Sequence, residues 1–288
     1  MSPSLIERVL ESLGFAHAPE LTPEGLRAIY AAWCQRVPFD NVRKLIHVRS
    51  GNPSPLPGHS PTDFFEAWLR HGTGGTCWAG AGPLQGFLVA LGFDAVRGVG
   101  TMLVTPDLPP NHGTVLVRFE ESATPLLVDS SILHSEPLPL APDGTATQVN
   151  HPAWGVRASQ REGRWHVRWR PLHRTDGFEC RLERFGATAE QFDRFHEQTR
   201  PWSPFNYELT VRANRGQNVV GAAFGHAVSL LADGTVRSAP ISHQERVRLL
   251  IEDIGISEEI VRLLPPDVPT PPPPGSQKAQ NQGRSDPD

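Results

Sequence analysis

A cysteine between a glycine turn and an apolar segment is the first candidate for chemistry in this sequence. Residues 74–82 read GGTCWAGAG, so Cys77 follows Gly74 and Gly75 and precedes a stretch that favours a helix. A thiolate is stabilised at a helix N-terminus and beside an imidazolium, and glycines let a substrate approach the backbone. Most buried cysteines only fill space, so Cys77 needs partners before it can be interpreted as a nucleophile.

A histidine and an aspartate further along the chain are the candidate partners. His112 opens the predicted strand GTVLVRFE, and Asp129 ends its predicted hairpin partner TPLLVD. A turn near residues 120–124 brings both to one end of the strand pair, although a register difference of three residues would separate them by about 10 Å. Each residue alone is more simply a loop or turn residue. Together, the order Cys77, His112, Asp129 favours a thiol triad in which the aspartate holds and charges the imidazole.

The first part of the chain, residues 1–93, predicts helices. Apolar side chains recur at helical spacing from Leu26 to Val37, and Thr22 suits the N-cap of that helix. The helix after Cys77 is expected to end at Gly92, since glycine favours the left-handed conformation that follows a helix. The candidate nucleophile is therefore predicted to lie where a turn meets a helix.

The remainder of the chain predicts strands, then mixed elements, then a tail. Residues 94–187 alternate as antiparallel strands do and indicate a sheet or small barrel. Residues 188–264 begin with a capping box of Thr188 and Gln191, followed by further strands and short helices. Residues 265–288 are proline-rich and poor in apolar residues, which predicts a disordered tail. We expect three structural parts and a tail.

Composition excludes several classes of function. The 288 residues are 38% hydrophobic with a net charge of −4, which gives no reason to expect nucleic acid or an anionic membrane as partner. No segment has the roughly 18 apolar residues that span a bilayer, and residues 1–15 lack a signal-peptide core. The three cysteines, at 34, 77 and 180, are too few and too distant for a disulfide framework or a metal site. A cytoplasmic protein without a bound metal is expected.

The motifs and their order resemble those of the arylamine N-acetyltransferases over about residues 1–264. The chain has Pro38-Phe39-Asp40-Asn41 where that family has Pro-Phe-Glu-Asn, and Gly74-Gly75-Thr76-Cys77 where it has Arg-Gly-Gly-x-Cys. Further matches follow in the family's order, namely Leu91-Gly92-Phe93, His112, Asp129, Pro137-Leu138-Pro139-Leu140 and Ser203-Pro204-Phe205. The resemblance implies an α+β fold with an N-terminal helical bundle, a central antiparallel β-barrel and a C-terminal α/β lid around a cysteine-proteinase-like core.

The resemblance also implies an activity, a ping-pong acyl transfer to an amine. Cys77 would take an acyl group from acetyl-CoA or another acyl thioester, for which an acyl carrier protein is an alternative source. His112 would move the protons and Asp129 would orient it. The implied substrate-binding residues are Phe39, Trp78 and Ile132, although Phe39 is equally well explained as a core anchor. No permanently bound cofactor and no metal are implied.

The sequence departs from the family's pattern around the nucleophile. Thr73 replaces the arginine before the glycines, residues 78–81 lack the family's polar side chains, and Ile132 replaces a pocket phenylalanine. Pro83 predicts a helix that starts later than in the family or is kinked. Three alternatives stay open: a divergent amide synthase of a biosynthetic pathway, a thiol hydrolase or transglutaminase-like amidase, and a non-catalytic binding protein.

Overall fold

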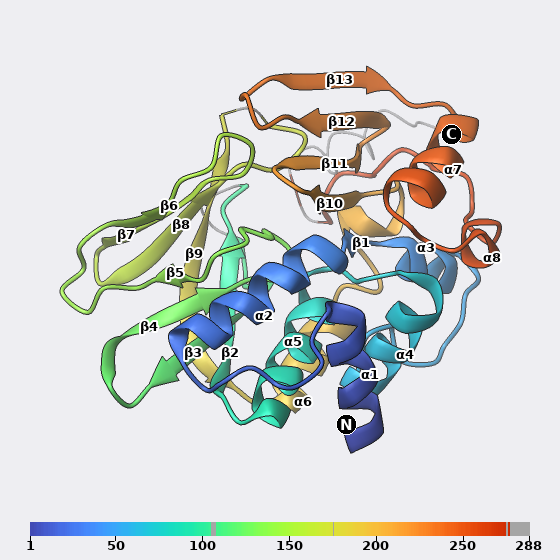
Figure 1. The fold of residues 1–288 in the computed structure, drawn as a ribbon. Helices are drawn as coiled ribbons and strands as arrows, with labels where there is room; N and C mark the ends of the chain where they lie inside the picture. The colour runs from blue at the N-terminus through green and yellow to red at the C-terminus, as the bar shows by residue number, and fades with distance from the viewer. Residues whose placement is uncertain (105–107, 175, 275, 277–288) are drawn as a thin grey trace.

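The N-terminal part is helical, as expected. The computed structural model describes residues 1–104, 108–174, 176–274 and 276 (Figure 1). Its first five helices are α1 (Pro3–Leu13), α2 (Pro23–Arg36), α3 (Val42–Arg49), α4 (Pro61–His71) and α5 (Cys77–Leu91). Thr22 caps α2 by accepting a hydrogen bond from the Gly25 N–H, and Gly92 ends α5 in the left-handed conformation. Both helix boundaries confirm the sequence prediction, because side-chain caps and glycine act locally.

Helix α5 is buried and packs against α4 on one side and against the strands β2 and β3 on the other. The predicted later start of this helix is wrong, since α5 begins at Cys77 and continues through Pro83. A proline inside a helix removes one backbone hydrogen bond and crowds the preceding turn. We attribute the tolerance of this loss to packing, because Leu84, Phe87 and Leu88 directly after Pro83 are fully buried.

The central part is a nearly closed barrel of eight antiparallel strands (Figure 1). Its strand order is β5-β4-β3-β2-β9-β8-β7-β6, and the edge strands β5 and β6 contact one another. The strands are β2 (Asp94–Met102), β3 (His112–Phe119), β4 (Ser122–Val128), β5 (Leu138–Pro139), β6 (Thr147–Val149), β7 (Val156–Arg161), β8 (Arg164–Trp169) and β9 (Phe178–Ala187). The α+β class with a central barrel is therefore confirmed.

The C-terminal part is a five-stranded antiparallel sheet with short helices. Helix α6 (Ala189–Glu197) leads into it, and its capping box of Thr188 and Gln191 is present as predicted. The sheet order is β1-β10-β11-β12-β13, so β1 (Phe39–Asp40) of the N-terminal part forms one edge. The other elements are η1 (Pro204–Asn206), β10 (Val211–Arg215), β11 (Asn218–Ala223), β12 (His226–Leu230), β13 (Val236–Pro240), α7 (His243–Arg248), the π-helix η2 (Leu249–Asp253) and α8 (Glu258–Val261).

Part of the predicted disordered tail is bound to helix α7 and to the residues just before β10. The Asp267 carboxylate pairs with Arg246 at 2.7 Å and accepts a hydrogen bond from the Leu209 N–H at 3.0 Å. The Thr270 hydroxyl donates to Glu208 at 2.8 Å. Residues 277–288 of the predicted tail lie outside the described residues. The low apolar content of residues 265–274 did not predict this binding, because the contacts of Asp267 and Thr270 are polar. Within the described residues, no helix is long and apolar enough to cross a bilayer.

Candidate active site

Cys77 is the first residue of α5, and the turn before it is held by a buried carboxylate. Asp40 accepts hydrogen bonds from the backbone N–H of Gly74 at 2.6 Å and of Val42 at 3.0 Å. A Cβ at Gly74 would lie 1.8 Å from the Pro38 carbonyl oxygen, so only glycine fits there. Burial raises the pKa of Asp40 to about 6, against the hydrogen bonds that lower it. Asp40 therefore fixes the geometry of the turn that presents the thiol.

His112 and Asp129 are in direct contact. His112 begins β3, and Asp129 follows β4, the strand paired with it. The Nε2 atom of His112 lies 2.7 Å from Oδ2 of Asp129, and the side chains are 2% and 1% exposed. Strand pairing of Val115 with Val128 sets the register that brings them together. Two residues that the sequence placed only near one end of a hairpin thus form a buried pair.

Three more groups fix the Asp129 carboxylate and its backbone. Its Oδ1 atom accepts hydrogen bonds from the Ser131 and Ile132 N–H groups, both at 2.9 Å. The Tyr30 hydroxyl of α2 accepts from the Asp129 N–H at 3.0 Å and donates to the Asp129 carbonyl at 2.9 Å. Burial by itself would raise the pKa of Asp129, but the charge and hydrogen bond of His112 hold it below its usual range. Asp129 is therefore held as a carboxylate.

The imidazole of His112 links this carboxylate to Cys77. Burial lowers the pKa of His112, but the charge of Asp129 and the hydrogen bonds to Asp129 and Cys77 together raise it well above its usual value. Nε2 is bound to Asp129, which leaves Nδ1 for the thiol. The Cys77 Sγ also approaches the Asn111 carbonyl oxygen at 3.6 Å. The site thus combines a buried, positively charged imidazole with a thiol on the first residue of α5.

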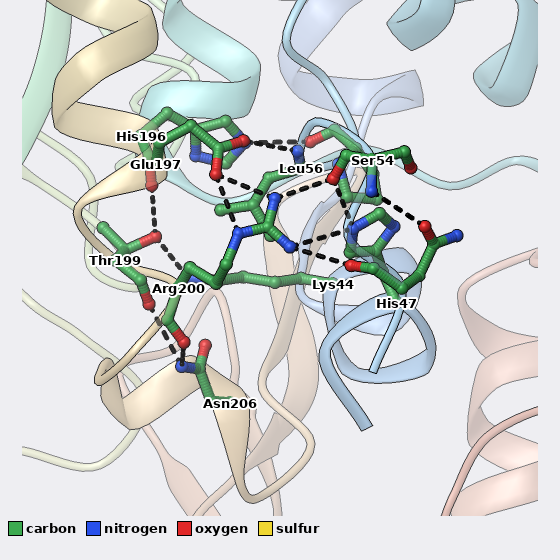
Figure 2. A network of polar contacts seen from close by, with 11 residues as sticks. Lys44, His47, Ser54, Leu56, His196, Glu197, Thr199, Arg200 and Asn206 are labelled. Carbon is green, nitrogen blue, oxygen red and sulfur yellow. Dashed lines mark hydrogen bonds and ion pairs between the residues drawn. The ribbon is translucent and has the colours of Figure 1, made fainter. Parts of the chain in front are cut away.

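A buried lysine adds a second cation to this region. Lys44 of α3 is 4% exposed, and its Nζ donates to the Thr199 hydroxyl at 2.7 Å, as Figure 2 shows. Burial lowers its pKa to about 7, while the charges of Cys77 and Glu197 act in the opposite direction. Lys44 is therefore a buried amine whose charge changes near neutral pH.

The end of α6 is tied to the loop over residues 52–57 (Figure 2). Glu197 forms an ion pair with Arg200 at 2.8 Å and accepts a hydrogen bond from the Leu56 N–H at 2.6 Å. Arg200 also donates to the carbonyl oxygens of Asn52 at 2.9 Å and Ser54 at 2.7 Å. Both Glu197 oxygens are thus engaged. The Lys44 ammonium donates its hydrogen bond to the neutral Thr199 hydroxyl, and no described carboxylate forms an ion pair with it.

Solved structures with this architecture share little sequence with the chain. The arylamine N-acetyltransferase from Mycobacterium abscessus matches with a TM-score of 0.75 and 18% identity, over 90% of this chain and 93% of that one. The arylamine N-acetyltransferase from Salmonella typhimurium matches with a TM-score of 0.72 and 18% identity, over 98% of each chain. The chain has the arylamine N-acetyltransferase fold. The Mycobacterium marinum arylamine N-acetyltransferase in complex with CoA also matches, with a TM-score of 0.75 and 18% identity over 90% of this chain and 97% of that one. No family model and no curated protein matches the chain.

Within this arylamine N-acetyltransferase fold, the three predicted substrate-binding residues lie in different surroundings. Phe39 belongs to the same apolar cluster as Cys77, and its ring meets that of Phe205 edge-on with centroids 5.4 Å apart. Trp78 is 3% exposed and stacks on Phe195 of the segment after the barrel, at 5.1 Å. Ile132 is 1% exposed and belongs to the apolar cluster of the barrel. Their role in binding stays a prediction.

Three buried polar residues with structural roles near the triad or its turn were not predicted from the sequence. Tyr30, Asp40 and Lys44 were not singled out, although Asp40 lies within a quoted motif. Lys44 directly follows Arg43, so the local sequence does not distinguish it from an exposed lysine. Among the described residues, no group of three or more histidines, cysteines or carboxylates could hold a metal ion.

Proposed function

We propose that this protein is a cysteine-dependent acyltransferase that moves an acyl group from a thioester to an amine. The contact chain from Cys77 through His112 to Asp129 supports the proposal most directly. The fold supports it further, since one similar structure is an arylamine N-acetyltransferase in complex with CoA. The three cysteines are free, which fits a reducing compartment, so we place the protein in the cytoplasm.

In the first half-reaction, the Cys77 thiolate attacks the carbonyl carbon of an acyl thioester such as acetyl-CoA. The bond from that carbon to the donor sulfur breaks as the acyl–Cys77 thioester forms. His112 gives its proton to the departing thiolate, which leaves as the free thiol. Backbone N–H groups at the start of α5 are the available donors for the oxyanion of the tetrahedral intermediate.

In the second half-reaction, the acceptor amine attacks the acyl group on Cys77. The amide bond forms, the bond to Cys77 sulfur breaks, and neutral His112 accepts the proton of the amine. The protein returns to the thiolate and imidazolium with which it began. Asp129 keeps the imidazole in place throughout. Cys77 is only 7% exposed, which favours a bound amine over bulk water as the acceptor.

Mass spectrometry tests the proposal. After incubation with acetyl-CoA, the intact protein should gain one acetyl group, and peptide mapping should place it on Cys77. Adding an aromatic amine should then release the acetyl group as the amide. Cys77→Ala should gain no acetyl group, whereas Cys34→Ala, which changes another buried cysteine, should behave as the wild type.

Two results would contradict the proposal. Release of the acetyl group to water at the same rate with and without amine would identify a thiol hydrolase. Absence of any acylation, together with equally slow alkylation of all three cysteines, would identify a protein in which the thiol is not activated.

A further inference from the structure

The turn after β4, residues 129–135, has a strained backbone. Leu133 and Ser135 have φ angles of 54° and 59°, in the left-handed region that residues other than glycine rarely adopt. They are two of the four non-glycine residues with positive φ among those that the structure describes. Such strain persists only where the surroundings fix the backbone, and it is common at active sites. Since the turn begins with Asp129, its geometry affects the candidate triad directly.

Tyr30 of α2 holds one part of this turn through its hydroxyl. The hydroxyl donates to the Asp129 carbonyl at 2.9 Å, and it accepts from the Asp129 N–H at 3.0 Å and from the His134 N–H at 3.3 Å. A phenol offers one donor and two acceptor sites, so the turn uses the full capacity of this hydroxyl. Burial raises the pKa of Tyr30 well above its usual value, so the hydroxyl keeps its proton and its donated bond at neutral pH.

Asn214 of β10 holds the other part of the turn. Its Nδ2 donates to the Leu133 carbonyl oxygen at 2.7 Å and to the Ser135 hydroxyl at 3.2 Å. These acceptors belong to the two residues with positive φ, so the amide stabilises the backbone where it is strained. The Asn214 side chain is 0% exposed, which keeps bulk water from competing for these bonds. Helix α2 packs against β10 (Figure 1), so the two side chains come from adjoining elements.

The same turn orients the Asp129 carboxylate. The N–H groups of Ser131 and Ile132, both within the turn, donate to its Oδ1 at 2.9 Å. This leaves Oδ2 for the Nε2 atom of His112 at 2.7 Å. A shift of the turn would move the two backbone donors and with them the direction in which Oδ2 faces the imidazole. The geometry of the triad therefore depends on whatever holds the turn.

We propose that Tyr30 and Asn214 are positioning residues of the acyl transfer, which hold the strained turn after β4 and so set the orientation of Asp129 toward His112. The proposal rests on the proposed function. Neither residue needs to touch a substrate, because both act through Asp129. Without either side chain the turn relaxes toward an unstrained backbone, and the hydrogen bond from His112 to Asp129 weakens.

Steady-state kinetics test the proposal. Tyr30→Phe removes only the hydroxyl, since the ring and its edge-on contact with His134, with centroids 4.9 Å apart, remain. We expect kcat for acetyl transfer from acetyl-CoA to aniline to fall about 10- to 100-fold, and KM for acetyl-CoA to change by less than about threefold. Asn214→Ala should act in the same direction. Because both residues act through one turn, the double variant should lose less kcat than the product of the two single losses.

Proton NMR tests the proposal without substrate. The His112 Nε2–H that is bonded to Asp129 should give a far-downfield resonance in wild type, which should move upfield in both single variants. Burial lowers the pKa of His112 and the charge of Asp129 raises it, so the pH at which the imidazole loses its proton should fall by about one unit in the variants. Gln85→Met, which removes a buried hydrogen bond to the Ala95 carbonyl, should lower the melting temperature and change neither His112 measurement.

Two results would overturn the proposal. The first is a lower melting temperature of Tyr30→Phe and Asn214→Ala with kcat, the downfield resonance and the His112 titration all as in wild type, which would show that the turn supports only the fold. The second is a kcat loss in the double variant equal to the product of the single losses, which would give the two residues independent roles. The expected His112 changes in a protein that forms no acyl–Cys77 would instead overturn the proposed function and retain the positioning role.

Discussion

At the scale of single residues, two titratable cations, His112 and Lys44, act on Cys77. His112 contacts it directly, and Lys44 acts on it through its charge. The two cations differ in what keeps them charged. His112 has the Asp129 carboxylate at 2.7 Å, whereas Lys44 has only the Thr199 hydroxyl. The Lys44 charge is therefore the one that changes near neutral pH.

Replacing Lys44 by methionine should slow the reaction of Cys77 only at low pH. Burial lowers the pKa of Lys44 to about 7, so the side chain is positively charged at about pH 6 and largely neutral at about pH 8.5. We expect iodoacetamide to alkylate Cys77 in Lys44→Met about three- to tenfold more slowly than in wild type at about pH 6, and at the same rate at about pH 8.5. Equal ratios at both pH values would contradict this role.

The same substitution should change the pH dependence of stability. The pKa of Lys44 is lower in the folded chain than in the unfolded one, so the unfolded state holds more protons between these two values. The free energy of unfolding of wild type should therefore rise with pH between about 7 and 10.5 through this group. Lys44→Met should lose that rise, which urea unfolding at several pH values can measure. Thr199→Val, which removes the hydroxyl that binds Nζ and keeps the lysine, is the matched control.

At the scale of elements, local signals were predictable and distant packing was not. The N-cap of α2, the end of α5 at Gly92 and the capping box of α6 depend on residues within one turn, and all three agree with the structure. The sequence order also suggested Cys77, His112 and Asp129. The pairing of β1 with β10 brings together segments about 170 residues apart, and no periodicity in the chain encodes it. Tyr30 and Lys44 gain their partners only through such packing.

Two glycines, Gly74 just before α5 and Gly82 within it, should respond differently to alanine. Gly74→Ala places a Cβ 1.8 Å from the Pro38 carbonyl oxygen, so the backbone must move and the Asp40 contact to Gly74 is lost. We expect the free energy of unfolding to fall by about 2–4 kcal/mol and Cys77 alkylation to slow. Gly82→Ala meets only Phe192 at 3.8 Å outside its chain neighbours, and its gain in helix propensity is offset by the crowding of a side chain that precedes Pro83, so the free energy of unfolding should change by less than about 1 kcal/mol. Urea unfolding of both variants checks the contrast, and similar values for the two would contradict it.

At the scale of the whole molecule, the candidate site needs all three parts of the fold. Cys77 comes from the helical part, His112 and Asp129 come from the barrel, and β10 of the C-terminal sheet pairs with β1, which bridges to Gly75 beside the nucleophile (Figure 1). Strand β1 and the bonds between α6 and the loop over residues 52–57 join these parts. The position of Cys77 relative to His112 and Asp129 therefore depends on the same interfaces that stabilise the fold.

The segment after α8 contributes to this integrity, although its composition predicts disorder. Asp267 accepts a hydrogen bond from the Leu209 N–H, just before β10, and pairs with Arg246, which is 4% exposed. Asp267→Ala leaves that buried guanidinium without its counter-ion, so we expect the free energy of unfolding to fall by about 2 kcal/mol. Glu252→Ala, at an exposed acidic residue of η2, should change it by less than about 0.5 kcal/mol. If urea unfolding shows the same small effect for both variants, residues 265–271 are not part of the folded unit. If only Asp267→Ala has a large effect, the folded unit extends past Leu264. The position of β10 then depends on that segment, because Asp267 binds the Leu209 N–H just before this strand.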